Sequence, residues 1–277
     1  MTPAALRRLL EQVAASAARV GELPDEAEAG PPAGPIFRPV DPRSAGVVAD
    51  WVTPVAQRWA PQLDLEPAAL GRVLAQRLAD HVSIAAVEVT PSGLLSITLA
   101  DPDRVAIIDE VTEQEGTYAL LPGQRAPDPG FDADPALGAE RSTVVPAWLR
   151  DDPALRPAQL AHARLHRLMR TARAAGVQIR PTDRREELGH VAERLLLVAL
   201  ADFPQRLDKH EGDRPQQVRA VTDLAALADG WTQPIRPRTV EEHIRGIHGA
   251  RLALATAAAV VLRNGLTRLG AAAPERM

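Results

Sequence analysis

The chain has 277 residues, enough for one or two domains with a buried core. Its apolar content of 45% and charged content of 25% are those of an ordinary globular protein, and the absence of cysteine excludes disulfides, thiolate metal sites and cysteine nucleophiles. No stretch reaches the roughly 18 apolar residues of a membrane span, and residues 1–20 lack the apolar core of a signal peptide. We therefore expect a cytoplasmic protein without a membrane partner.

Charge is unevenly distributed along the chain. Residues 1–140 hold 10 arginines and 21 acidic residues, a net charge of −11, whereas residues 141–277 hold 22 basic and 15 acidic residues, a net charge of +7. Lys209 is the single lysine, so arginine supplies nearly all of the positive charge. This asymmetry indicates that only the second half would meet a polyanion; the alternative is that mixed charge keeps an alanine-rich protein soluble.

Residues 1–100 predict a small mixed domain. Leu6, Leu9 and Leu10 have helical spacing, Pro39 bars its strand from a central place in a sheet, and Pro91-Ser-Gly93 predicts a turn between two apolar runs. The expected elements are a helix over 3–20, a loop over 21–35, an edge strand over 36–40, helices over 47–59 and 66–80, and a β-hairpin of strands 84–90 and 94–99.

Residues 101–150 predict a linker, because residues 122–135 are dense in proline, glycine and aspartate. Residues 151–277 predict helices. The first covers 159–175, a second is opened by a capping box of Asp183 with Glu186, a third ends near Gly230, and a long fourth is opened by Thr239 with Glu242 and is bent or ended by Asn264-Gly265.

The predicted fold class is α+β. A small N-terminal α/β domain with a short antiparallel sheet, residues 1–100, is followed by the linker and by a C-terminal antiparallel α-helical bundle, residues 151–277.

Three segments of the second half carry a family resemblance. They are Leu160-Ala-His-Ala-Arg164, then Glu193 followed by Leu200-Ala-Asp-Phe-Pro204, and finally Arg251 to Met277, which closes with Pro-Glu-Arg-Met. In this order and spacing they resemble the helical anticodon-binding domain of arginyl-tRNA synthetases, called the DALR domain. More faintly, Phe37-Arg-Pro-Val-Asp-Pro42 and the hairpin around Gly93 are similar to the N-terminal additional domain of these enzymes, which contacts the D-loop of tRNA. Leu94 and Ser96 stand where that family has an aromatic residue and an asparagine, which puts the D-loop contact in doubt.

The signatures of the synthetase catalytic domain do not occur in this sequence. His243-Ile-Arg-Gly246 shares letters with the His-Ile-Gly-His-like motif but lies in a predicted helix, and residues 101–150 are too few for a nucleotide-binding domain. We therefore expect no ligase activity, no catalytic residues and no cofactor. His162 and His166 have a spacing that could bind zinc, but no third ligand is evident, so we expect no metal site.

The resemblance implies a set of RNA-binding residues: His162, Arg164, Arg167, Trp231, Arg236, Arg238, Asn264, Arg276 and Met277. Trp231 is expected to stack on an unpaired anticodon base, and the arginines to contact phosphates. The alternatives are structural. His162 would hydrogen-bond within the bundle, Trp231 would be a partly buried residue at a helix end, and Met277 would simply dock on the bundle.

These patterns predict a non-catalytic relative of arginyl-tRNA synthetase that binds tRNA through its C-terminal bundle, with tRNA(Arg) favoured and DNA not expected. Its role would be regulatory or would concern tRNA delivery. The alternative is a protein-interaction scaffold that has lost RNA binding and pairs with a synthetase or a metabolic enzyme. A weaker alternative is an accessory to aminoacylation.

Overall fold

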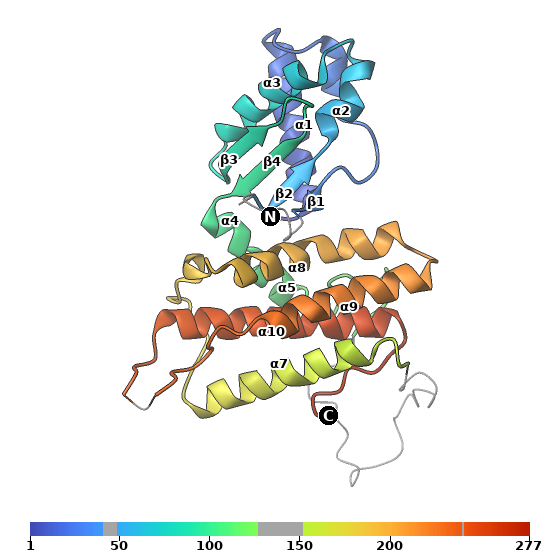
Figure 1. Ribbon diagram of the computed structural model, residues 1–277. Coiled ribbons are helices and arrows are strands. Elements are labelled where there is room, and N and C mark those ends of the chain that lie inside the picture. The colour runs from blue at the N-terminus through green and yellow to red at the C-terminus, as the bar shows by residue number, and fades with distance from the viewer. Residues whose placement is uncertain (41–48, 127–151, 240) are drawn as a thin grey trace. The chain divides into compact units, whose positions relative to one another are not determined.

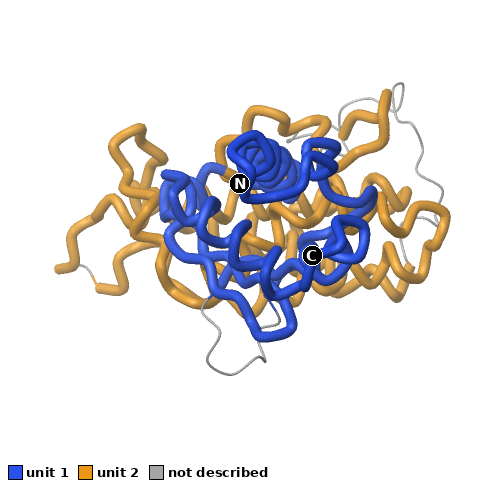
Figure 2. The backbone as a smooth tube through the Cα atoms, turned by 90° about the horizontal axis from the view of Figure 1, so that it is seen from above, with its two compact units in different colours: residues 1–106 blue, residues 107–277 orange. Residues whose placement is uncertain are grey.

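The computed structural model describes residues 1–40, 49–126, 152–239 and 241–277. They form two compact units, residues 1–106 and residues 107–277 (Figure 2). Nearly half of the expected linker, residues 127–150, lies outside the described residues, as do residues 41–42 of the Phe37–Pro42 motif.

Unit 1 is an α/β fold around a small antiparallel sheet. Its strands are β1 (Arg38–Pro39), β2 (Trp51–Thr53), β3 (Ile84–Val89) and β4 (Leu95–Leu99), in the order β1-β2-β4-β3. The helices are α1 (Pro3–Arg19), η1 (Asp25–Ala29), α2 (Val55–Trp59), η2 (Ala60–Gln62), α3 (Pro67–Ala79) and α4 (Asp101–Val105).

The expected hairpin and edge strand are confirmed. β3 pairs with β4 around the turn at Pro91–Gly93, and β1 lies at one edge of the sheet, where Pro39 costs no ladder hydrogen bond. Along β4 burial alternates, with Leu95, Ile97 and Leu99 buried. Helix α3 packs on β3 and on α1, so these buried side chains form one core with the helices (Figure 1).

The helix expected over 47–59 is wrong for its first part. Residues 51–53 form β2, which pairs with β4 through Trp51 opposite Ile97 and Thr53 opposite Leu95. Trp51 and Thr53 are fully buried, and a bulky aromatic, a valine and a threonine in succession fit a pleated strand better than a helix. Helix α2 begins only after Pro54.

A buried ion pair fixes the end of unit 1. Asp50, just before β2, accepts from the Arg104 Nε at 3.0 Å and from the Leu99 N–H at 2.8 Å. Arg104 also donates to the Leu99 carbonyl at 2.7 Å. Both charged side chains are at most 4% exposed, so the pair joins β2, β4 and α4 inside the core. Removing either side chain would leave the other buried charge without this partner.

Unit 2 is a helical bundle. Its elements are α5 (Ile107–Glu113), α7 (Arg156–Ala174), η3 (Arg185–Glu187), α8 (Val191–Lys209), α9 (Arg214–Gly230) and α10 (Gly246–Arg268). Helices α4 and α5 occupy residues 101–113, which we expected to belong to the linker.

Helix α10 is the centre of the bundle. It packs against α5, α7, α8 and α9, and residues 252–255 and 257–266 are buried without interruption (Figure 1). A helix that is apolar on all sides is expected where neighbours surround it. The antiparallel bundle predicted from short connections is confirmed.

Both predicted capping boxes are wrong. Helix α8 begins at Val191, where the His190 Nδ1 accepts from the Ala192 N–H at 3.2 Å and the Glu193 carboxylate accepts from the His190 N–H at 3.0 Å. Helix α10 begins at Gly246, with the His248 Nδ1 accepting from the Arg245 N–H at 3.1 Å. Histidine supplies the cap in both places, a residue that the usual Ser/Thr/Asp pattern does not detect.

Asn264 and Gly265 do not end α10, which continues to Arg268. A Cβ placed on Gly265 would lie 2.7 Å from the Phe203 Cζ, so glycine is needed here for close packing of α10 on α8 rather than for a turn. The Asn264 side chain donates to the carbonyls of Glu115 and Tyr118, both at 2.9 Å.

Side chains of α10 hold the segment after α5, residues 115–119, on the bundle. Besides Asn264, Arg263 donates to the Glu115 carbonyl at 3.0 Å and Arg268 to the Ala119 carbonyl at 3.2 Å. The Tyr118 hydroxyl donates to the Leu200 carbonyl at 2.8 Å. This carbonyl lacks its normal helical donor because the residue four positions on is Pro204, which has no N–H.

Tyr118→Phe should therefore lower the free energy of unfolding by about 1–3 kcal/mol, since it leaves the buried Leu200 carbonyl unpaired. In a Pro204→Ala background the helix supplies its own donor, and the same substitution should cost much less. Urea unfolding of the four proteins measures this coupling. An equal cost of Tyr118→Phe in both backgrounds would contradict this role of the hydroxyl.

Candidate nucleic-acid interface

Helix α7 is the most basic element of the bundle. Its 19 residues include five arginines and no acidic residue. Alanines and other apolar residues cover the side that packs against α9 and α10, so the arginines are left to the outer side. Four of them are exposed: Arg156, Arg167, Arg170 and Arg173.

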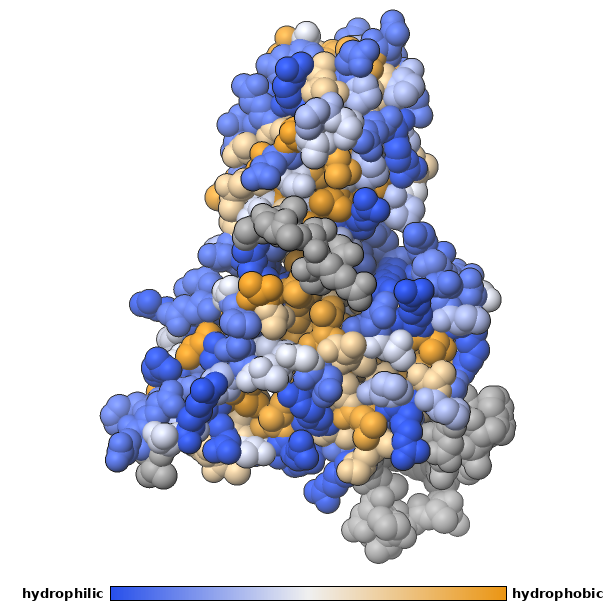
Figure 3. Space-filling model, in the orientation of Figure 1, coloured by the Kyte–Doolittle hydropathy of each residue, from blue (hydrophilic) through white to orange (hydrophobic). Residues whose placement is uncertain are grey.

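The loop between α9 and α10 runs beside the C-terminal half of α7. Arg164 on α7 donates to the Trp231 carbonyl at 3.2 Å, and a Cβ placed on Gly176 would lie 3.5 Å from the Ile244 Cδ1 (Figure 1). The loop therefore starts near the middle of α7 and ends near its C-terminus. On either side of residue 240, which lies outside the described residues, the loop carries mainly hydrophilic side chains (Figure 3).

A buried carboxylate holds this loop. Arg251 of α10 donates to the Glu193 Oε1 at 2.7 Å and to the Pro234 carbonyl at 3.2 Å. Glu193 is fully buried, and its other oxygen accepts from the His190 N–H at the start of α8. One arginine thus joins α8, α10 and the loop.

Residues 271–277 lie along α7 as an irregular segment. Gln159 donates to the Ala272 carbonyl at 3.0 Å, the His162 Nδ1 lies 2.9 Å from the Pro274 carbonyl oxygen, and the His166 Nδ1 lies 3.6 Å from a Glu275 carboxylate oxygen. Because these partners advance together along the chain, the segment follows α7 toward its C-terminal end. Arg276 and Met277 therefore come to the same half of α7 as Arg170.

Two of the predicted RNA-binding residues make contacts within the bundle. Arg164 donates to the Ala228 carbonyl at 3.0 Å as well as to that of Trp231, so it caps the end of α9, with Asp229 beside it at 3.5 Å. Trp231 is 1% exposed. Because a buried indole offers no face to a base, the predicted stacking would require Trp231 to leave the core.

His162 and Asn264 are also buried. His162 is 1% exposed and bonds to the segment 271–277, as its structural interpretation predicted. Burial lowers the pKa of its imidazole from 6.5 to about 4, so the ring is neutral at neutral pH and donates from Nδ1 to the carbonyl. The Asn264 side chain donates to the carbonyls of Glu115 and Tyr118 and not to α7 or the segment 271–277.

The remaining candidates are exposed and lie on α7, on the loop between α9 and α10, or on the segment 271–277. They are Arg167, Arg236, Arg238, Arg276 and Met277, the last with 62% of its surface accessible. Arg170 and Arg173 join them, although the sequence analysis did not choose them as candidates. The absence of acidic residues from α7 was the signal that could have found them. We call Arg167, Arg170, Arg173, Arg236 and Arg238 the basic face; within the described residues none of the five has a carboxylate within salt-bridge distance.

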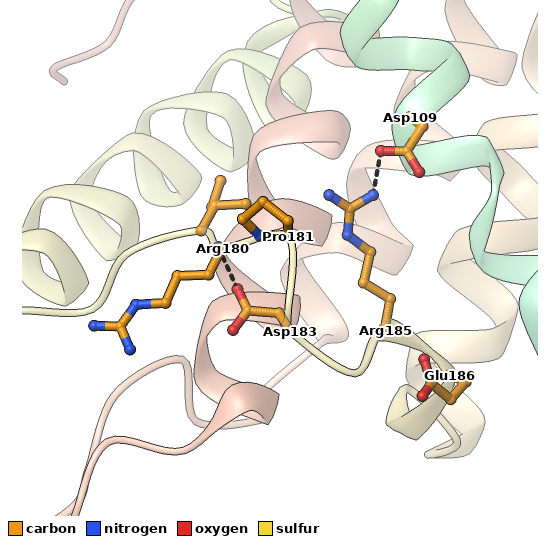
Figure 4. A pocket seen from close by; sticks show the side chains of 7 residues that line it. Asp109, Arg180, Pro181, Asp183, Arg185 and Glu186 are labelled. Atoms are coloured by element: carbon orange, nitrogen blue, oxygen red, sulfur yellow. Dashed lines mark hydrogen bonds and ion pairs between the residues drawn. The ribbon is translucent and has the colours of Figure 1, made fainter.

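A pocket of about 570 Å³ lies beside this region, between α5 and the loop that precedes α8. Its charges are largely satisfied internally, since Arg185 pairs with Asp109 and the Asp183 carboxylate accepts from the Arg180 N–H at 2.6 Å (Figure 4). The Arg180 side chain extends away from Arg185 and Glu186 (Figure 4). The pocket therefore offers no concentrated charge of one sign to a ligand.

The described residues include no cluster of three or more histidine or acidic side chains that could hold a metal ion. None of the helices in the described part of the chain is long and apolar enough to cross a membrane.

Comparison with known families now decides what this bundle is. Residues 158–277 match the family model described as the DALR anticodon binding domain. The C-terminal part of the chain is thus similar to the DALR anticodon-binding domain, and we call residues 158–277 the DALR domain. The DALR domain begins inside α7 and includes both the basic face and the segment 271–277.

The chain is related to arginine–tRNA ligases. It is 35% identical over 175 residues to the enzyme of Clavibacter sepedonicus and 32% identical over 180 residues to that of Heliobacterium modesticaldum. Each alignment covers 62% of this chain but only 29% and 30% of the two ligases, so the chain spans less than a third of their length. No solved structure matches.

The different roles of Arg164 and Arg167 can be tested by measuring how each substitution changes the free energy of unfolding. Arg164→Gln should lower the free energy of unfolding by about 1–2 kcal/mol, because two carbonyls at the end of α9 lose a charged donor. Arg167→Gln, on the same helix but exposed, should change it by less than about 0.5 kcal/mol. Urea unfolding followed by far-UV circular dichroism compares the two; equal stabilities would refute the capping role.

His162 should make the DALR domain sensitive to acid. Its folded pKa of about 4 lies below the ordinary 6.5, so the neutral ring contributes stability above pH 6.5 that is lost as pH falls toward 4. His162→Asn keeps an amide N–H for the Pro274 carbonyl but cannot titrate. Relative to this variant, the wild-type protein should lose up to about 3 kcal/mol between pH 7 and pH 4. A difference between the two that is independent of pH would exclude this assignment.

Proposed function

We propose that this chain is a non-catalytic tRNA-binding protein whose DALR domain contacts tRNA through the basic face, with tRNA(Arg) as the favoured ligand. The observation that carries the proposal is helix α7, which exposes four arginines and contains no acidic residue, inside a domain of the anticodon-binding family. Relatedness to arginine–tRNA ligases supports the choice of tRNA(Arg).

The basic face suits a phosphate backbone. Guanidinium groups bind phosphate oxygens in pairs of hydrogen bonds, and each neutralised phosphate releases counterions that favour association. Arg167, Arg170 and Arg173 stand on a rigid helix, and the loop with Arg236 and Arg238 is held by the Arg251 bond to Pro234. The helix and the start of the loop are therefore positioned before RNA arrives, which lowers the entropy lost on binding.

We further propose that the protein holds a tRNA for another enzyme, or withholds it, rather than aminoacylating it. The sequence contains neither of the two synthetase signature motifs, and the matched family model is an RNA-binding domain. ATP–pyrophosphate exchange with arginine should accordingly be absent. Activity in that assay from the purified chain would overturn this part of the proposal.

Binding of a tRNA(Arg) transcript, measured by fluorescence anisotropy, should reach the micromolar range or better at low salt and weaken steeply as salt increases. Replacing Arg167, Arg173 and Arg236 together by glutamine should weaken it by at least tenfold and flatten the salt dependence. The matched control replaces Arg19, Arg38 and Arg72, three exposed arginines of unit 1, and should change affinity less than threefold.

If no tRNA bound to the protein at low salt, the proposal would be refuted. A protein captured by the chain after nuclease treatment, together with that failure, would point instead to an interaction scaffold.

A further inference from the structure

We infer that the DALR domain of this chain recognises RNA by its phosphate backbone and shape, and does not discriminate the anticodon sequence. The inference rests on the proposed function and deepens it by naming what the basic face reads. Its basis is the closed state of Trp231, combined with the chemistry of the groups that remain exposed.

The backbone of Trp231 is hydrogen-bonded within the bundle and its side chain is buried. Its N–H donates to the Leu227 carbonyl at 3.1 Å and its carbonyl accepts from Arg164, so the residue forms the end of α9. The indole is 1% exposed and belongs to the core beside α7. Turning it outward would open the apolar core, so the ring is a structural element of the bundle.

The other aromatic rings of the described part of unit 2 are closed in the same way. Tyr118 is 2% exposed and engaged with the Leu200 carbonyl, and Phe203 is 2% exposed against Gly265 of α10. Sequence-specific recognition of single-stranded RNA commonly stacks unpaired bases on exposed aromatic rings before reading their edges. In residues 107–126, 152–239 and 241–277 no phenylalanine, tyrosine or tryptophan ring is exposed, and the exposed rings are those of histidines such as His190 and His243.

The exposed groups point to a different ligand surface. Arg167, Arg170, Arg173, Arg236 and Arg238 carry charge, and phosphate contacts position a protein without reporting the base sequence. Acidic side chains border the basic face, with Asp229 beside Arg164, Glu275 beside His166 and Glu242 bonded to the Arg238 N–H. Because these carboxylates repel phosphates, an RNA strand that follows the basic face is favoured over a polyanion that wraps around the domain.

The test uses the full chain and transcripts that differ only in the anticodon loop. Four transcripts are compared by anisotropy across a salt series: tRNA(Arg), the same tRNA with two different replaced anticodons, and the same tRNA with all loop bases changed to uridine. We expect dissociation constants within threefold of one another and equal salt slopes. The triple glutamine variant of Arg167, Arg173 and Arg236 should lose affinity for all four by the same factor.

A second measurement follows Trp231 directly. In protein labelled with 5-fluorotryptophan, the ¹⁹F resonance of Trp231, assigned by its loss in Trp231→Phe, should not shift when tRNA saturates the protein. A loss of affinity above tenfold on anticodon replacement, or a large shift of that resonance with tRNA bound, would overturn the inference while leaving the proposed function intact. Failure of every transcript to bind would overturn both.

Discussion

The buried carboxylate of Glu193 is the constraint on which the bundle depends. It receives the Arg251 guanidinium from α10 and the His190 N–H from the start of α8, while Arg251 also holds the Pro234 carbonyl. Removing one partner of such a pair leaves a buried charge uncompensated and typically costs about 3–5 kcal/mol. The contact sets the start of α8, the depth of α10 and the path of the loop that carries Arg236 and Arg238. The path of the loop that carries part of the basic face therefore depends on a pair in the core.

A second dependence links the DALR domain to residues outside it. The family match begins at residue 158, yet α5 and residues 114–121 are part of the same bundle. Pro204 removes a donor from α8, Tyr118 supplies the missing one, and Arg263, Asn264 and Arg268 bond to carbonyls of the segment that carries Tyr118. Since buried carbonyls need partners, the bundle and this segment stabilise each other. Asn264 and Gly265, which resemble a helix end in the sequence, are instead used for these contacts.

The structure also separates two kinds of arginine on one helix. Arg164 and Arg167 are one turn apart on α7, but Arg164 reaches the end of α9 whereas Arg167 has no neighbour to cap. The same separation applies to the predicted site as a whole. His162, Arg164, Trp231 and Asn264 maintain the bundle, and the arginines around them face outward. The candidate residues that the family resemblance implies therefore fall into two groups, buried residues that hold the helices in place and exposed residues that are accessible to a ligand.

The sequence by itself determined the α+β class, the hairpin, the helical second half and the DALR relationship, because periodicity, turn residues and motif order are local or linear properties. The strand at Trp51–Thr53 and the continuation of α10 through Asn264 were decided by the tertiary structure. The starts of α8 at Val191 and of α10 at Gly246 rest on local histidine contacts that the usual cap pattern does not detect. The strand and the continuation of α10 depend on partners distant in the chain, through the pairing of Trp51 with Ile97 and the fit of Gly265 against Phe203. Which arginines and which aromatic rings reach solvent was also decided there, because burial is a property of packing, and two arginines one helical turn apart have the same local sequence signal.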